Sequence, residues 1–97
     1  MKIKTKSGFE CNMNERRLKD WRYVKAAARM NSGDESEIAM GLTFAIPFLL
    51  GDAGENALMD HVADPDGTVD SEKLIMEFLE ITQIAGQKAK KSQSSLD

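Results

Sequence analysis

The chain has few residues that could cross-link it or anchor it in a membrane. Its 97 residues include one cysteine, Cys11, so an internal disulfide is excluded, which agrees with a reducing compartment. The longest apolar run, residues 42–50, contains Thr43 and Pro47 and is much shorter than the roughly 18–20 residues that span a bilayer. The charged N-terminus lacks the apolar segment of a signal peptide. We therefore expect a protein that remains in the cytoplasm and does not enter a membrane.

The residues needed for catalysis are equally scarce. His61 is the only histidine, and Cys11, the only thiol, is remote from it in the sequence. The chain has no Gly-x-Gly-x-x-Gly motif, no phosphate-binding loop ending in Gly-Lys-Ser/Thr and no Gly-x-Ser-x-Gly elbow. We expect a binding protein rather than an enzyme, with no cofactor.

One acidic segment, residues 64–70, resembles the middle of a calcium-binding EF-hand loop. If Gly67 is the obligatory glycine of such a loop, the first ligand position falls on Val62 and the bidentate glutamate position falls on Lys73. Neither side chain can bind calcium. The segment therefore predicts an acidic turn that leads into a helix, and we expect no metal there.

The charges of the chain are unevenly distributed. Residues 1–33 carry nine Lys or Arg against three Asp or Glu, whereas residues 34–86 carry one Lys against twelve Asp or Glu. Two interpretations follow. The basic and acidic parts attract each other within one fold, or they attract each other between copies, which predicts a homo-oligomer that weakens with salt.

Hydrophobic periodicity predicts a mainly helical α+β domain over residues 1–86. Segments 2–6 and 9–13 alternate around Ser7-Gly8 and predict a β-hairpin, with one face formed by Ile3, Phe9, Cys11 and Met13. Asn14 is a favourable N-cap for a first helix over 15–30. Its apolar stripe is Leu18, Trp21, Val24 and Ala28, and we expect Trp21 to be buried against the hairpin.

Three more helices are predicted, over residues 37–50, 53–63 and 71–86, which makes about four in all. Pro47 predicts a kink near Ala45-Ile46, and Gly51 ends that helix. Residues 87–97 have almost nothing to bury, so we expect a disordered tail. The second and last helices carry more apolar residues than one stripe accommodates. The candidate interaction surface therefore comprises Met40, Phe44, Phe48, Phe78 and Ile81.

The basic first helix raises an alternative function, that of a small DNA-binding regulator of a mobile element. It carries six basic residues, which can contact phosphates: Arg16, Arg17, Lys19, Arg22, Lys25 and Arg29. The same spacing is typical of any solvated helix face, and the rest of the chain is strongly acidic. Binding to nucleic acid is therefore the less favoured interpretation.

The order of these elements resembles that of phage tail assembly chaperones, small proteins of long-tailed phages and prophages of Gram-positive hosts. The likeness covers nearly the whole chain. It rests on the opening KIKTKSGFE, Asp20-Trp21, Ser32-Gly33-Asp34, Leu49-Leu50-Gly51, His61, Asp66-Gly67-Thr68-Val69 and the Lys/Ser-rich C-terminus. Two features depart from the family pattern: residues 22–25 make the first helix more basic, and Pro47 comes later in the second helix.

The resemblance implies a function in building the phage tail. Such a protein would bind the tape measure protein, keep that long hydrophobic helical rod soluble and help recruit tail tube protein. It would act in the cytoplasm of the bacterial host and be absent from the mature virion. The family has no catalytic site, so the resemblance implies no catalytic residues.

Overall fold

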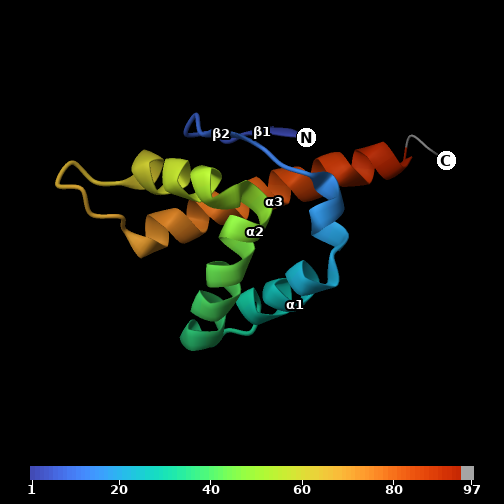
Figure 1. Cartoon of the computed structure of the whole chain (residues 1–97), viewed down its shortest axis with the longest axis horizontal. Coiled ribbons are helices and arrows are strands. Elements are labelled where there is room, and N and C mark those ends of the chain that lie inside the picture. Colours follow the sequence, from blue (N-terminus) through green and yellow to red (C-terminus); the bar gives the residue numbers. More distant parts are fainter. Residues whose placement is uncertain (95–97) are drawn as a thin grey trace.

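The computed structural model describes the backbone of residues 1–94 and the side chains of residues 1–91 (Figure 1). The elements are β1 (Lys2–Lys4), β2 (Glu10–Asn12), a 3₁₀ helix η1 (Glu15–Lys19), α1 (Trp21–Met30), α2 (Glu35–Val62) and α3 (Ser71–Ser94). The predicted combination of a hairpin with a mainly helical chain is confirmed. The described part of the chain has three α-helices rather than about four.

The N-terminal hairpin forms as the sequence predicts. The strands are antiparallel, with Ile3 opposite Cys11, and Gly8 adopts a φ of 96° in the turn between them. Positive φ is readily accessible to glycine, so this residue suits the turn. Ile3, Phe9 and Met13 are buried and Cys11 is half-buried, which confirms the predicted inner face. The hairpin covers α3 and the second part of α2 (Figure 1).

The first predicted helix, over 15–30, is interrupted at Asp20. Asn14 caps η1 through its side chain, but Asp20 is extended, with φ −67° and ψ 133°, and caps the separate helix α1. This break changes which side chains face inward. Trp21 and Val24 are 68% and 41% exposed, so the prediction that Trp21 is buried was wrong.

Helix α2 contains two of the predicted helices, joined across a kink. The only non-helical backbone angles within it are those of Gly51, with φ 76° and ψ 167°. These angles strongly favour glycine. The kink predicted near Ala45-Ile46 was wrong, because Pro47 remains within the helix. The break at Gly51 agrees with the prediction that the helix ends at that residue. The first part of α2 (35–50) packs beside α1, and the second part (52–62) lies beside α3 (Figure 1).

The loop before α3 is the predicted acidic turn. Gly67 has a φ of 89°, and its backbone N–H donates to the carbonyl of Asp64 at 2.8 Å. The Asp70 carboxylate accepts a bond from the backbone N–H of Glu72 at 2.8 Å at the start of α3. The predicted disordered tail, 87–97, is helical as far as Ser94, and its remaining residues lie outside the described ones. Lys88 Nζ donates to the Lys2 carbonyl at 2.7 Å, which joins this extension to β1.

The core lies where the hairpin, α2 and α3 meet. Its largest fully buried side chains are Phe78, Ile3, Leu58 and Ile81, and α2 also contributes Leu42, Ala45, Ile46 and Leu49. By length and composition alone α2 also qualifies as a candidate membrane span, with a mean hydropathy of 1.3 over 18 residues. A core helix of a soluble protein passes the same test, so this is weak evidence for a membrane segment.

Candidate interaction groove

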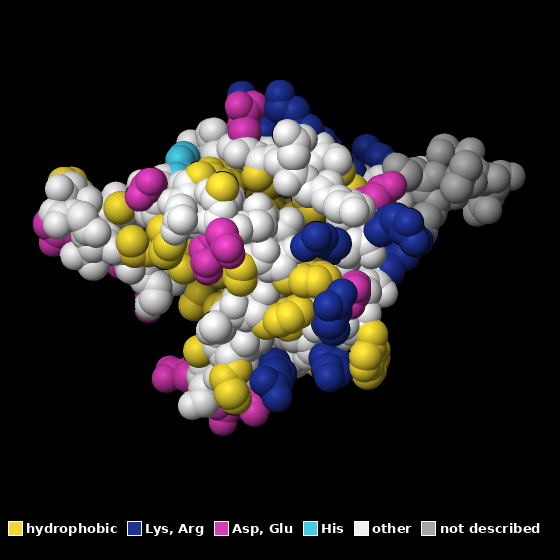
Figure 2. Space-filling view, in the orientation of Figure 1, with side chains coloured by type: hydrophobic (Ala, Val, Ile, Leu, Met, Phe, Trp, Pro, Cys, Tyr) yellow, Lys and Arg dark blue, Asp and Glu magenta, His cyan; other side chains and the backbone are white. Residues whose placement is uncertain are grey.

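The largest group of exposed apolar side chains lies between α1 and the first part of α2. We call it the α1–α2 groove, and its lining residues are Trp21, Arg22, Val24, Lys25, Ala26, Ala28, Arg29, Met40, Gly41 and Phe44. The four large apolar members are 37–68% exposed. Figure 2 shows apolar side chains bordered by Lys and Arg at the lower right, over α1. A contiguous apolar surface rimmed by charge is typical of a protein-binding site.

Close backbone contact between the two helices forms the floor of the groove. A Cβ atom at Gly41 would lie 2.6 Å from the backbone oxygen of Ala26 and 2.9 Å from Cγ of Met30. Both distances are too short for ordinary packing, so only glycine allows this approach. Because the helices touch at Ala26 and Gly41, the larger side chains beside them are left at the surface.

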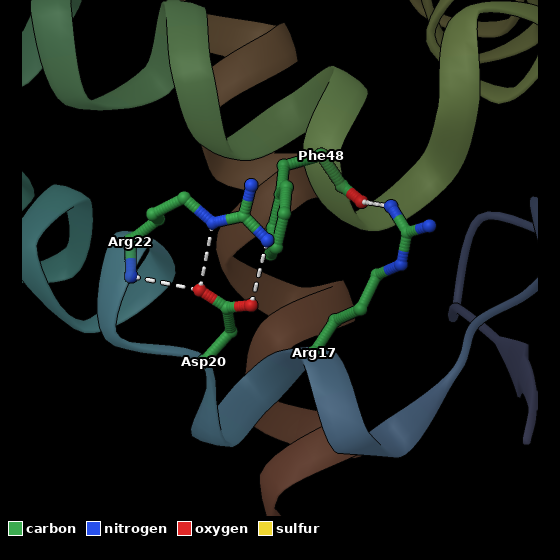
Figure 3. A network of polar contacts seen from close by, with 4 residues as sticks. All are labelled: Arg17, Asp20, Arg22 and Phe48. Atoms are coloured by element: carbon green, nitrogen blue, oxygen red, sulfur yellow. Dashed lines mark hydrogen bonds and ion pairs between the residues drawn. The ribbon is translucent and has the colours of Figure 1, made fainter.

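An arginine cluster fixes one end of the groove (Figure 3). The Phe44 and Phe48 rings stack with centroids 4.9 Å apart. The guanidinium carbons of Arg17 and Arg22 each lie 5.1 Å from the centroid of Phe48, and in Figure 3 they approach the ring from opposite sides. Arg17 Nη1 also donates to the Phe48 carbonyl at 2.6 Å. These contacts join η1 and α1 to the first part of α2 and hold the aromatic pair in place.

Asp20 holds the Arg22 side chain in this position. Its carboxylate accepts bonds from the Arg22 backbone N–H at 2.9 Å, from Nε at 3.1 Å and from Nη2 at 2.9 Å. The side-chain bonds with Arg22, followed by the backbone bond, lower the pKa of Asp20 from 3.8 to about 2. The charged carboxylate therefore caps α1 and orients Arg22 toward Phe48 at the same time.

A pH titration tests this arrangement. Because the pKa of Asp20 is lower in the folded state, its stabilising effect is complete above pH 3.8 and is lost as the pH falls through about 2. We expect the Asp20 carboxyl carbon to titrate by NMR with a midpoint near 2, and the midpoint to rise in Arg22→Gln. A midpoint near 3.8 in the unsubstituted protein would mean that the Asp20–Arg22 contact does not form in solution.

The structure divides the predicted interaction surface. Met40 and Phe44 line the groove, and Phe48 is half-buried beside it. Phe78 and Ile81 are fully buried, so their assignment to a surface was wrong. They belong to the stripe of α3 that packs into the core, whereas Met76 and Leu79 occupy the outer face. Sequence reasoning also missed Trp21 as a surface residue. Asp20 is the residue that could have indicated this exposure, because Asp is a strong N-cap and Trp21 directly follows it.

A second polar cluster joins the hairpin turn to the helices. The hydroxyls of Thr5 and Ser7 both donate to Oε1 of Glu77, and Ser7 Oγ lies 2.8 Å from Nε2 of His61. In a hydrolytic triad the carboxylate would orient the imidazole, but here it binds the serine. The backbone N–H of Lys6 donates to Glu80 at 2.7 Å. The cluster therefore anchors the turn of the hairpin to α2 and α3.

Within the described residues, no group of three or more His, Cys, Asp or Glu side chains is placed to hold a metal ion. In the acidic turn, the Asp64 carboxylate accepts a bond from Lys73 and the Asp66 carboxylate accepts one from the backbone N–H of Thr68. The turn is thus closed by its own hydrogen bonds. Comparisons with models of known families, with curated proteins and with solved structures found no match to this chain.

Proposed function

We propose that this protein is a phage tail assembly chaperone that binds a helical segment of the tape measure protein in the α1–α2 groove. The observation that carries the proposal is the exposed apolar lining of that groove. Trp21 is 68% exposed and Met40 is 46% exposed on adjacent helices. Large apolar side chains left at the surface together favour a partner that covers them.

The shape and composition of the groove favour a helix as the partner. Two helices form its walls, so a third helix laid between them would bury apolar residues at i, i+3 and i+7. Trp, Met and Phe supply most of the apolar lining. Tryptophan and arginine are enriched among the residues that dominate binding energy, and both are present here. The arginine cluster around Phe48 holds one end of this surface in a fixed arrangement.

The rest of the proposal depends on the resemblance in sequence. A chaperone of this kind would act by binding and not by catalysis. It would keep the tape measure protein soluble in the cytoplasm of the bacterial host, bring tail tube protein to it and leave before the virion is complete. An apolar rod covered in this way would bury its side chains against the apolar lining of the groove.

The DNA-binding alternative is less well supported by the contacts of the basic residues. Arg17 is bound to the Phe48 carbonyl, Arg22 to Asp20, and Arg29 lies 3.4 Å from Glu37. These arginines are therefore engaged with their own chain. Mobility-shift assays at low salt separate the two functions, because retardation of random duplex DNA at micromolar protein would favour the regulator.

Co-expression with the tape measure protein tests the chaperone. The unsubstituted chain is expected to keep a tape measure segment in the soluble fraction and to co-purify with it. Met40→Glu places a charge in the apolar lining, so we expect at least about a tenfold loss of affinity. Trp21→Ala is expected to weaken binding to a similar extent.

Leu79→Glu provides the matched control. Leu79 is 46% exposed, as Met40 is, but it lies on the outer face of α3, away from the groove. We expect it to co-purify with the tape measure segment as the unsubstituted chain does. Equal losses in Met40→Glu and Leu79→Glu would contradict a binding site in the groove. No co-purification by the unsubstituted chain would contradict the function itself.

A further inference from the structure

Strand β1 presents backbone groups along its outer edge. The backbone N–H of Thr5 donates to the Phe9 carbonyl at 2.9 Å, so this pair is a hydrogen-bonded one. In an antiparallel ladder such pairs alternate with unbonded ones, and the backbone groups of Lys2 and Lys4 therefore point away from β2. A row of outward N–H and C=O groups is a template with which a further strand can pair.

Side chains of α3 occupy both ends of this edge and leave its middle open. Lys88 Nζ donates to the Lys2 carbonyl, and the Glu80 carboxylate accepts a bond from the Lys6 backbone N–H, each at 2.7 Å. Among the described residues, none forms a hydrogen bond with the outward N–H or C=O of Lys4. The unpaired peptide groups of Lys4 thus lie between two anchored points.

A second groove lies beside this edge, between β1 and α3. We call it the β1–α3 groove, and its lining residues are Lys4, Thr5, Lys6, Met76, Leu79, Glu80, Gln83, Ile84 and Gln87. Met76 is 72% exposed, the highest value among the large apolar residues, and Leu79 is 46% exposed. Lysines commonly protect an edge strand from pairing, but they do not explain large apolar side chains left at the surface beside it. A segment paired with the edge would cover those side chains.

The charges of the β1–α3 groove favour an acidic segment. Its charged lining residues are Lys4, Lys6 and Glu80, and Glu80 already accepts the Lys6 N–H. Among the described side chains, 1–91, neither of these lysines forms an ion pair. Carboxylates on one face of an added strand would lie beside Lys4, since opposite charges stabilise cross-strand pairs. Because side chains alternate along a strand, the residues between them would face α3, where apolar ones bury against Met76 and Leu79.

We propose that the β1–α3 groove binds an extended, acidic segment of a partner protein, which adds to the edge of β1 as a third strand. In this mode of recognition, main-chain hydrogen bonds supply affinity and alternate side chains supply specificity. The N–H and C=O of Lys4 pair with the backbone of the segment, and the Lys4 and Lys6 ammonium groups bind its carboxylates. This inference goes beyond the proposed function and does not rest on it, because it uses neither the α1–α2 groove nor a helical partner.

Titration with a synthetic peptide tests the groove. The probe is a capped peptide of alternating valine and glutamate, about six residues long, the length of an ordinary strand. We expect it to bind at concentrations up to about 1 mM. Replacing its glutamates with lysines, or methylating the backbone nitrogens that pair with β1, is expected to weaken binding at least about tenfold. No binding by the valine–glutamate peptide, or equal binding by either control peptide, would overturn the proposal.

Met76→Glu tests the surface on the protein. The new carboxylate would face an acidic segment in the groove, so we expect at least about a tenfold loss of affinity for the valine–glutamate peptide. Val69→Glu is the matched control: it makes the same change in net charge at an exposed apolar residue that does not line the groove, and it should bind as the unsubstituted chain does. Far-UV circular dichroism and melting temperature verify that both variants are folded. Equal losses in the two would overturn the proposal.

Two spectroscopic signals locate the bound peptide. The Lys4 N–H is expected to exchange more slowly with solvent once it pairs with the peptide, whereas Ile3, which already pairs with Cys11, should change little. Trp21 lies in the α1–α2 groove, so its emission should stay constant. A shift in Trp21 emission without protection of Lys4 would place the peptide in the α1–α2 groove and overturn the proposal. Binding of the tape measure segment is measured separately, so the two proposals can fail independently.

Discussion

Phe78→Ala is expected to lower the free energy of unfolding by about 3–5 kcal/mol. Phe78 is fully buried with Ile3, Leu58 and Ile81, where the hairpin, α2 and α3 meet. Removing the ring leaves a cavity that side chains from three elements would have to fill. For a small domain such a loss is a large share of the total stability, so we expect partial unfolding at 37 °C. Urea denaturation followed by circular dichroism measures the change.

Met76→Ala is the control, because Met76 lies two residues away on the same helix but is 72% exposed. A surface substitution of this kind is expected to change stability by less than about 0.5 kcal/mol. If Phe78→Ala had as small an effect as Met76→Ala, Phe78 would lie at the surface, as the sequence alone suggested, and the packing of α3 would be incorrect.

The second large effect is expected at Gly41. Alanine usually stabilises a helix interior relative to glycine by about 1 kcal/mol, but a Cβ at this position would lie 2.6 Å from the Ala26 backbone oxygen. Backbone atoms move less readily than a flexible side chain, so α1 would be pushed away from α2. We expect Gly41→Ala to destabilise the fold by about 1–3 kcal/mol. Because the groove lies along this contact, binding in the groove is expected to weaken as well.

Gly86→Ala serves as the matched helix substitution. Gly86 lies within α3, and apart from its chain neighbours and the backbone of its own helix, a Cβ there would meet no atom within 4 Å. Alanine has a higher helix propensity than glycine, so we expect the free energy of unfolding to rise by about 0.5–1 kcal/mol. Opposite signs at the two glycines would identify close packing as the cause. A gain at Gly41 equal to that at Gly86 would contradict the contact between α1 and α2.

The sequence predicted local features well where one residue determines the backbone. Gly8 places the hairpin turn, and Asp64-Pro65-Asp66-Gly67 forms the acidic turn before α3. On α3 the sequence analysis assigned Phe78 and Ile81 to a surface, whereas both are fully buried. Periodicity shows which residues share a face, but burial depends on which face meets the core.

The features that the sequence did not predict depend on competition between local signals or on distant contacts. Asn14 and Asp20 are both good N-caps, and the second one ends η1 and begins α1, which turns Trp21 outward. Pro47 was expected to kink its helix and does not, whereas Gly51, where the sequence predicted that helix to end, is the position of the kink, because glycine readily adopts the positive φ. Residues 87–94 have little to bury, but they continue α3, and Lys88 reaches β1.

The uneven distribution of charge along the sequence can be interpreted only with the structure. The sequence left open whether the basic and acidic parts meet within one chain. In the structure Arg29 of the basic part pairs with Glu37 of the acidic part, whereas Lys73 pairs with Asp64 within the acidic part. In the α1–α2 groove, α1 supplies both the tryptophan and the basic rim.

Trp21 fluorescence tests the central claim most directly, because this residue is the only tryptophan and lies in the α1–α2 groove. At 68% exposed, it should emit as a solvated indole. Titration with a tape measure segment that lacks tryptophan is expected to shift the emission to shorter wavelength in the unsubstituted chain and in Leu79→Glu, but not in Met40→Glu. Unchanged Trp21 emission at a concentration where the segment is shown to be bound would place the contact elsewhere and contradict the groove as the binding site.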